Sequence, residues 1–135
     1  MSAWTFYRIS GGLFNPAVTL GLYLIGTLTW YRSLVLVLMQ FIGAISAAGI
    51  TQVIVPGGIN VRTRLNCTVA QGFLIEMICT FFIMFTVYML ATEKHKATFI
   101  APVGLGLALF VVELFALSLT GGSLNPARTL GTYFA

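Results

Sequence analysis

The stretch SGGLFNPAVTLG at residues 10–21 returns as TGGSLNPARTLG at residues 120–131. The two copies agree at Gly-Gly, Asn-Pro-Ala and Thr-Leu-Gly. Asn15 and Asn125 suit the N-cap of a helix, because an asparagine oxygen can accept hydrogen bonds from the first free N–H groups. Proline follows at the first helical position, where its missing N–H does no harm. Each copy therefore predicts the start of a short helix whose N-terminal end carries the positive pole of the helix dipole.

A single Asn-Pro-Ala predicts only an ordinary helix start. Two copies in matching frames are a far more specific signal. The glycine pairs before them, Gly11-Gly12 and Gly121-Gly122, allow positive φ, so the backbone carbonyls there can face outward.

The composition is that of a membrane protein. Hydrophobic residues make up 59% of the chain and charged residues only 7%, against about 25% charged in soluble domains. So few charged side chains cannot cover a soluble surface, and lipid must surround most of the chain. The net charge of +4 then gives no argument for a nucleic-acid partner and reports orientation instead.

Three uncharged or nearly uncharged segments are long enough to cross a bilayer, and the two segments after Asn-Pro-Ala are too short. The expected elements of a single domain over residues 1–135 are a re-entrant half-helix at 16–25, spans at 33–55, 69–91 and 99–119, and a second half-helix at 126–135. Because three spans separate the half-helices, the two must enter from opposite faces, as in an inverted repeat. The predicted fold is all-α.

Three features of the first span and of the turn before it concern contacts. Residues 26–32 read as a turn, in which Trp30, Tyr31 and Arg32 favour the membrane interface. Small residues at four-residue spacing over 43–49 predict the close approach of another helix. Gln40 fits both a polar contact between helices and a pore-facing role.

The charged residues at membrane depth are the candidates for function. Arg128 lies in the first turn of the second half-helix, where the dipole disfavours a cation by about 0.3–1 kcal/mol. A guanidinium at this depth needs a partner or water, which favours a pore-lining donor. Glu113 lies fifteen residues earlier and could pair with it. Glu76 also needs a partner, and the backbone N–H groups of the re-entrant loops are the candidates.

No enzyme site is predicted. The sequence carries no Ser-His-Asp, Cys-His, paired-carboxylate or phosphate-cradling arrangement, and we expect no cofactor and no metal. His95 is expected to be a solvated loop residue. Cys67 and Cys79 would lie about 18 Å apart along a helix, too far for a disulfide.

Basic residues give the orientation. They divide into Arg8, Arg32, Lys94 and Lys96 on one side and Arg62 and Arg64 on the other. The larger group predicts that the loop at 92–98 is cytoplasmic.

The chain resembles the aquaporin, or major intrinsic protein, family, and its loops look like the fungal branch. The resemblance rests on both repeated stretches and on QFIGA from Gln40, EMICTF from Glu76 and GLGLAL from Gly104. It implies a passive water channel in which half-helix dipoles and an arginine exclude cations. It also implies a homo- or hetero-tetramer.

The resemblance assigns roles to individual residues. The pore motifs would be Asn15, Pro16, Ala17, Asn125, Pro126 and Ala127, with the asparagine amides donating to single-file water. The selectivity filter would contain Arg128, Glu113 and Gly122. Carbonyls around Gly11, Gly12, Gly121 and Gly122 would line the vestibules, and Glu76 would hold a pore loop.

The chain departs from the family at three points. Water-selective members usually carry His at the position of Glu113 and often Cys at that of Gly122, which leaves glycerol or another small solute as an alternative. Glycerol channels usually have Asp where Thr129 stands. The family has six spans and this chain resembles spans three to five, so we expect a truncated member. A non-conducting subunit that associates with full-length relatives is a further alternative.

Overall fold

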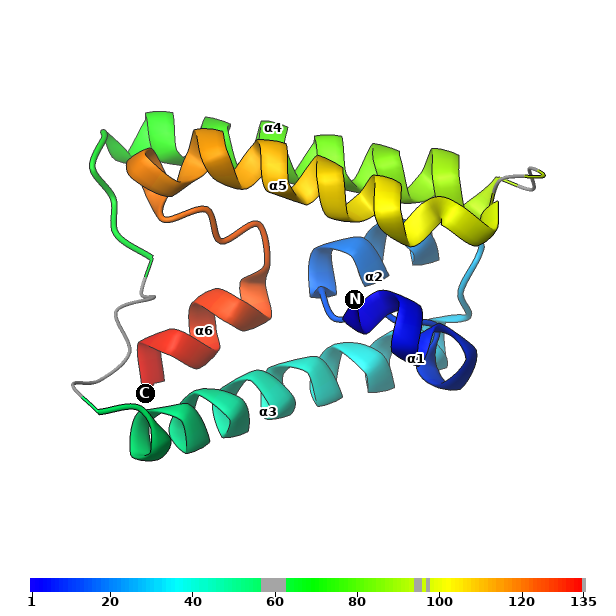
Figure 1. Cartoon of the computed structure of the whole chain (residues 1–135), viewed down its shortest axis with the longest axis horizontal. Coiled ribbons are helices and arrows are strands. Elements are labelled where there is room, and N and C mark those ends of the chain that lie inside the picture. The colour runs from blue at the N-terminus through cyan, green and yellow to red at the C-terminus, as the bar shows by residue number, and fades with distance from the viewer. Residues whose placement is uncertain (57–62, 94–95, 97, 135) are drawn as a thin grey trace.

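A computed structural model describes residues 1–56, 63–93, 96 and 98–134. These residues form helices and connecting loops, and the expected all-α class is confirmed (Figure 1). The helices are α1 Ser2–Ser10, α2 Pro16–Leu24, α3 Trp30–Ile54, α4 Val69–Val87 with the π-helical turn Tyr88–Thr92, α5 Ala101–Thr120 after the 3-10 turn Thr98–Ile100, and α6 Pro126–Phe134. The expectations for Arg62, Lys94, His95 and Ala135 lie outside the described residues.

Three of these segments are long and apolar enough to cross a membrane: Trp30–Ile54, Val69–Thr92 and Thr98–Thr120. The three expected spans are therefore present. The turn expected over Trp30–Arg32 is wrong, because these residues form the first turn of α3. Thr29 is extended, and its carbonyl accepts from Ser33 N at 3.0 Å. Interface-favouring side chains are compatible with a helix that extends beyond the hydrocarbon.

Helix α1 was not expected from the sequence. It ends at Gly11, which adopts φ 88° and donates its N–H to Tyr7 O at 3.0 Å. This left-handed glycine cap is a common way to end a helix. Residues 1–10 carry no apolar run long enough to predict the helix that precedes it.

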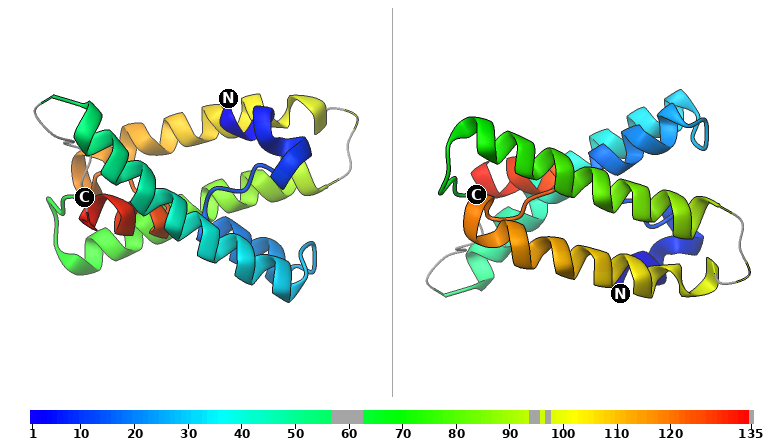
Figure 2. Two further views of the ribbon diagram at one scale, coloured as in Figure 1. Left: turned by 90° about the horizontal axis from the view of Figure 1, so that it is seen from below. Right: turned by 90° about the horizontal axis from the view of Figure 1, so that it is seen from above.

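The helices form three layers (Figure 1). Helices α4 and α5 pack side by side on one face, and α3 lies on the other. The short helices α2 and α6 lie between them, and both contact α3. Figure 2 shows that α3 crosses the α4–α5 pair obliquely. This arrangement brings the N-terminal ends of α2 and α6 together in the middle of the molecule.

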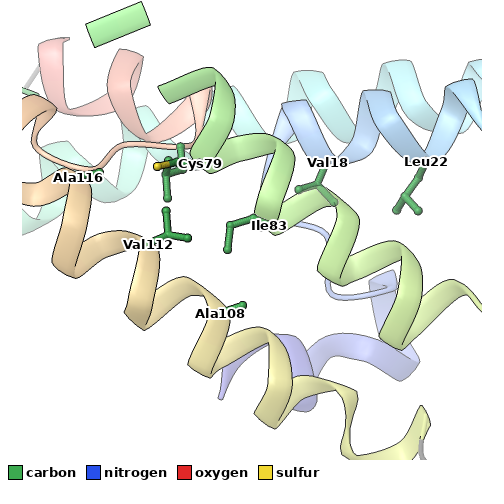
Figure 3. Packing of buried hydrophobic residues seen from close by; sticks show 8 residues of the cluster. Val18, Leu22, Cys79, Ile83, Ala108, Val112 and Ala116 are labelled. Atoms are coloured by element: carbon green, nitrogen blue, oxygen red, sulfur yellow. The ribbon is translucent and has the colours of Figure 1, made fainter. Parts of the chain in front are cut away.

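The buried cluster joins α2, α4 and α5 (Figure 3). Ala108, Val112 and Ala116 follow one another at four-residue spacing on α5, so they share one helix face. Cys79 and Ile83 do the same on α4. Small side chains on α5 let the α4 backbone approach closely, which is how helices associate in lipid. Both cysteines are free, and Cys79 is buried.

The close approach of another helix that was expected at residues 43–49 of α3 occurs at Ala44, against α6. A Cβ on Gly131 of α6 would lie 2.8 Å from the carbonyl carbon and oxygen of Ala44, so only glycine fits there. Gly43 and Gly49 have no atom of another segment within 4 Å of a Cβ position. The small residues of 43–49 thus admit a helix, but not at their glycines.

The substitution Gly131→Ala tests this packing. Because its Cβ would overlap the Ala44 backbone, we expect the free energy of unfolding to fall by about 1–3 kcal/mol. The matched controls Gly43→Ala and Gly49→Ala should gain up to about 1 kcal/mol of helix propensity. Equilibrium unfolding in detergent, followed by circular dichroism, measures all three. Equal stability of the three variants would contradict the α3–α6 contact.

Candidate functional site

Each Asn-Pro-Ala starts its half-helix as the sequence predicts. Asn15 Oδ1 accepts from Ala17 N at 3.0 Å. Asn125 Oδ1 accepts from Ala127 N at 3.0 Å and from Arg128 N at 3.3 Å. Pro16 and Pro126 are the first residues of α2 and α6. Both asparagine oxygens are therefore used to cap the helices, which leaves the amide nitrogens for other contacts.

The amide nitrogens tie the two loops to each other. Asn15 Nδ2 donates to Leu124 O at 2.8 Å, and Asn125 Nδ2 donates to Phe14 O at 2.9 Å. Each contact joins residues more than one hundred positions apart. An asparagine amide carries two hydrogens, and among the described residues only one acceptor is present for each. The second hydrogen of each amide is left for a group outside this part of the chain.

Gln40 of α3 holds the first loop. Its Nε2 donates to Leu13 O at 3.0 Å and to Thr19 Oγ1 at 2.9 Å. The Thr19 hydroxyl donates in turn to Asn15 O at 3.0 Å, and the residue is fully buried. Of the two roles left open by the sequence, the structure gives Gln40 the polar contact between segments. Its Oε1 is buried and has no partner among the described residues.

Glu76 of α4 lies against the second loop. Its Oε1 accepts from Ser123 N at 3.1 Å and from the Thr120 hydroxyl, and its Oε2 accepts from Leu124 N at 2.7 Å. Hydrogen bonds to a charged group are shorter and stronger than those between neutral groups. Three donors, two of them backbone N–H groups, thus surround this carboxylate of an apolar helix that is long enough to cross a membrane.

The backbone of both loops turns through left-handed conformations. Gly11 and Gly12 have φ of 88° and 66°, and Gly121 and Gly122 have 82° and 56°. Leu124 also has a positive φ, 51°, which is unfavourable for a residue with a Cβ. Its N–H is bound by Glu76 and its carbonyl by Asn15. These two contacts hold Leu124 in a conformation that no local signal in the sequence predicts.

Arg128 lies next to Glu113 and the second glycine pair. Its Nη1 donates to Gly121 O at 3.4 Å and to Gly122 O, and its Nη2 donates to Gly121 O at 3.4 Å. Glu113 Oε1 of α5 lies 3.7 Å from Nη1. The side chains of Arg128 and Glu113 are 33% and 31% exposed. The structure therefore brings together all three residues assigned to the filter.

Several residues of this site were missed from the sequence. Thr19, Thr120, Ser123 and Leu124 all take part in the loop contacts. A sequence signal was available only for Thr19, because the repeated Thr-Leu-Gly makes it the equivalent of Thr129. The Thr129 hydroxyl hydrogen bonds to that of Ser123. Within the described ranges no group of three His, Cys, Asp or Glu side chains could hold a metal ion.

Comparisons with known proteins point to one family. The family model described as major intrinsic protein matches residues 1–135. The chain is 53% identical over 133 residues to Aquaporin-7 of Botryotinia fuckeliana (strain B05.10), covering 97% of this chain and 29% of that protein. It is 51% identical over 134 residues to Probable aquaporin-3 of Gibberella zeae, covering 97% and 47%. The chain thus spans about a quarter to a half of the length of the curated relatives it matches.

The substitution Glu76→Gln tests the support of the second loop. A glutamine amide would turn its own N–H₂ toward backbone donors, and leaving a buried donor unsatisfied costs about 1–3 kcal/mol. We expect hydrogen exchange at the Ser123 and Leu124 amides to speed up about tenfold or more. The control is Glu93→Gln, which removes an exposed carboxylate. Unchanged exchange at both amides would contradict the role of Glu76.

The first loop has a matching test in Gln40→Met. Methionine keeps the length of the side chain and removes the N–H₂ that binds Leu13 O and Thr19 Oγ1. We expect faster hydrogen exchange at the Ala17 amide, whose N–H donates to the capping oxygen of Asn15. Exchange at the Ser123 and Leu124 amides should not change. Equal changes in both loops would show general destabilisation instead of separate supports.

Proposed function

Because the chain belongs to the major intrinsic protein family, as its resemblance predicted, we propose that it forms a passive channel for water around its two half-helices. The observation that supports this most directly is the pair of reciprocal bonds between the loops. They hold two helix N-termini together and leave one N–H of Asn15 and one of Asn125 without an acceptor in the described chain. Two donors at one point fit the oxygen of a passing water molecule.

The helix dipoles explain why such a passage excludes cations. Each half-helix carries about half a positive charge at its N-terminus, and α2 and α6 present these ends to the same region. A water molecule that accepts from both asparagines directs its hydrogens away along the pore. The hydrogen bonds between successive water molecules would then change direction at the asparagines, where the potential is also positive. Both effects would oppose the passage of protons. No catalytic reaction is part of this proposal, and channels of this family are transporters.

The narrow filter would lie on the side of the asparagines where the second glycine pair, Gly121-Gly122, is found. We assign Arg128 as its donor, Glu113 as its acceptor and Gly122 as a backbone wall without a side chain. Pro16, Ala17, Pro126 and Ala127 would set the direction of the two half-helices. Carbonyls of Gly11 and Gly12 would line the first vestibule. Those of Gly121 and Gly122 accept from Arg128 and would serve to hold the guanidinium.

A small-solute facilitator is the second candidate, and one observation favours it. Position 113 carries a carboxylate and position 122 a glycine. The filter therefore offers a hydrogen-bond acceptor at the first position and no side chain at the second. Glycerol carries hydroxyl groups that both donate and accept, and it fits such a site. Assembly as a homo- or hetero-tetramer and a cytoplasmic loop at 92–98 remain proposals from the family and from the distribution of charge.

Osmotic shrinkage of proteoliposomes containing the full chain tests the function. We expect water flux well above that of empty vesicles, followed by light scattering. Flux of water without glycerol supports the water channel, and flux of both supports the facilitator. No flux above the empty vesicles would contradict both and favour a subunit that associates with full-length relatives.

The substitution Arg128→Val tests the filter in the same vesicles. Removing the guanidinium leaves Glu113 as an unpaired carboxylate beside the passage, so we expect cations and protons to leak through. A pH-sensitive dye inside the vesicles measures this leak, with water flux retained. Glu93→Gln, which changes one charge at an exposed position, is the control for general damage. Proton exclusion equal to that of the native chain would show that Arg128 is not part of the filter.

A further inference from the structure

The filter site contains two opposite charges, on Arg128 and Glu113, and the described residues bind only the first of them by hydrogen bonds. Arg128 donates to the carbonyls of Gly121 and Gly122. Glu113 lies 3.7 Å from the guanidinium, beyond hydrogen-bond distance, and no donor of the described residues binds its carboxylate. About a third of each side chain is exposed. Arg128 is therefore anchored by the protein, whereas the oxygens of Glu113 remain available to a solute.

Gly122 and Glu113 are matched to each other. A Cβ on Gly122 would overlap Glu113 Oε2, and Gly122 is buried with φ 56°. The carboxylate thus occupies the volume that any side chain at position 122 would need. This packing holds the negative charge beside Arg128 without a hydrogen bond to Glu113.

No other acidic group can take this role. The sequence contains three acidic residues, Glu76, Glu93 and Glu113. Glu76 is bound by three donors of the second loop. Glu93 is exposed at the end of the π-helical turn after α4. Glu113 alone is placed to balance the charge of Arg128.

Resting on the proposed channel function, we propose that Glu113 determines the charge selectivity of the filter. Its carboxylate cancels the charge of Arg128, so the site is neutral and presents donors and acceptors side by side. Such a site takes small uncharged solutes that both donate and accept hydrogen bonds, and it holds no anion. Without Glu113 an unpaired guanidinium in this partly buried site would attract anions.

The substitution Glu113→Gln tests this in the purified full chain. Glutamine keeps the size and one acceptor oxygen but removes the charge. Calorimetric titration with nitrate at constant ionic strength should detect binding at least about tenfold tighter than in the native chain. The double variant Glu113→Gln/Arg128→Gln should lose this binding again, because the site is neutral once more. Glu93→Gln should bind nitrate no better than the native chain.

The outcomes separate this proposal from the proposed function. Equal nitrate affinity in the native chain and in the folded Glu113→Gln variant overturns the charge role, whether or not the vesicles pass water. New nitrate binding without water flux in any vesicle supports the charge role and contradicts the channel. If Glu113→Gln does not fold, Arg128→Gln provides the reverse test. Its unpaired Glu113 should bind caesium that the native chain does not bind, and the absence of binding overturns the proposal.

Discussion

The structure depends on one constraint: backbone N–H and C=O groups that are enclosed by the protein and shielded from water need partners. Helices satisfy their own groups, but the loops at residues 11–15 and 121–125 cannot. Side chains from the long helices do it for them. Gln40 binds a carbonyl of the first loop, and Glu76 binds two N–H groups of the second. The asparagines then bind one carbonyl in the opposite loop each.

The two loops have nearly the same sequence and are nevertheless supported by opposite chemistry. Gln40 supports the first loop as a donor, and Glu76 supports the second as an acceptor. A neutral amide brings no charge to the first loop. The second loop receives a carboxylate from α4 and lies beside another on α5. All ionic interactions described for the half-helices are therefore found around α6, and the repeat is symmetric in backbone but not in electrostatics.

The sequence predicted those parts of the fold that depend on local chemistry. Asn-Pro-Ala placed the first residues of α2 and α6 correctly, because capping involves only neighbouring residues. The three spans followed from length and hydropathy. The partners of Gln40 lie 27 and 21 residues away, and the positive φ of Leu124 is imposed by contacts with α4 and the first loop. Such features depend on tertiary packing. The same reason explains why Ala44, and not Gly43, meets α6: the register of two helices is set by their whole contact surface.

The residues that directly follow the two Asn-Pro-Ala motifs show how tertiary context gives different roles to equivalent positions of the repeat. Val18 follows the first motif and is buried in the apolar cluster where α2 packs on α4. Arg128 follows the second, where the helix dipole and the partial burial of the side chain both disfavour a cation. It is stable there because the carbonyls of Gly121 and Gly122 accept its hydrogens and Glu113 lies beside it. Both glycines of the pair adopt a positive φ while their carbonyls accept from the guanidinium. The arginine, the two glycines and the glutamate are therefore one structural unit, in which the backbone supplies acceptors to the charged side chain.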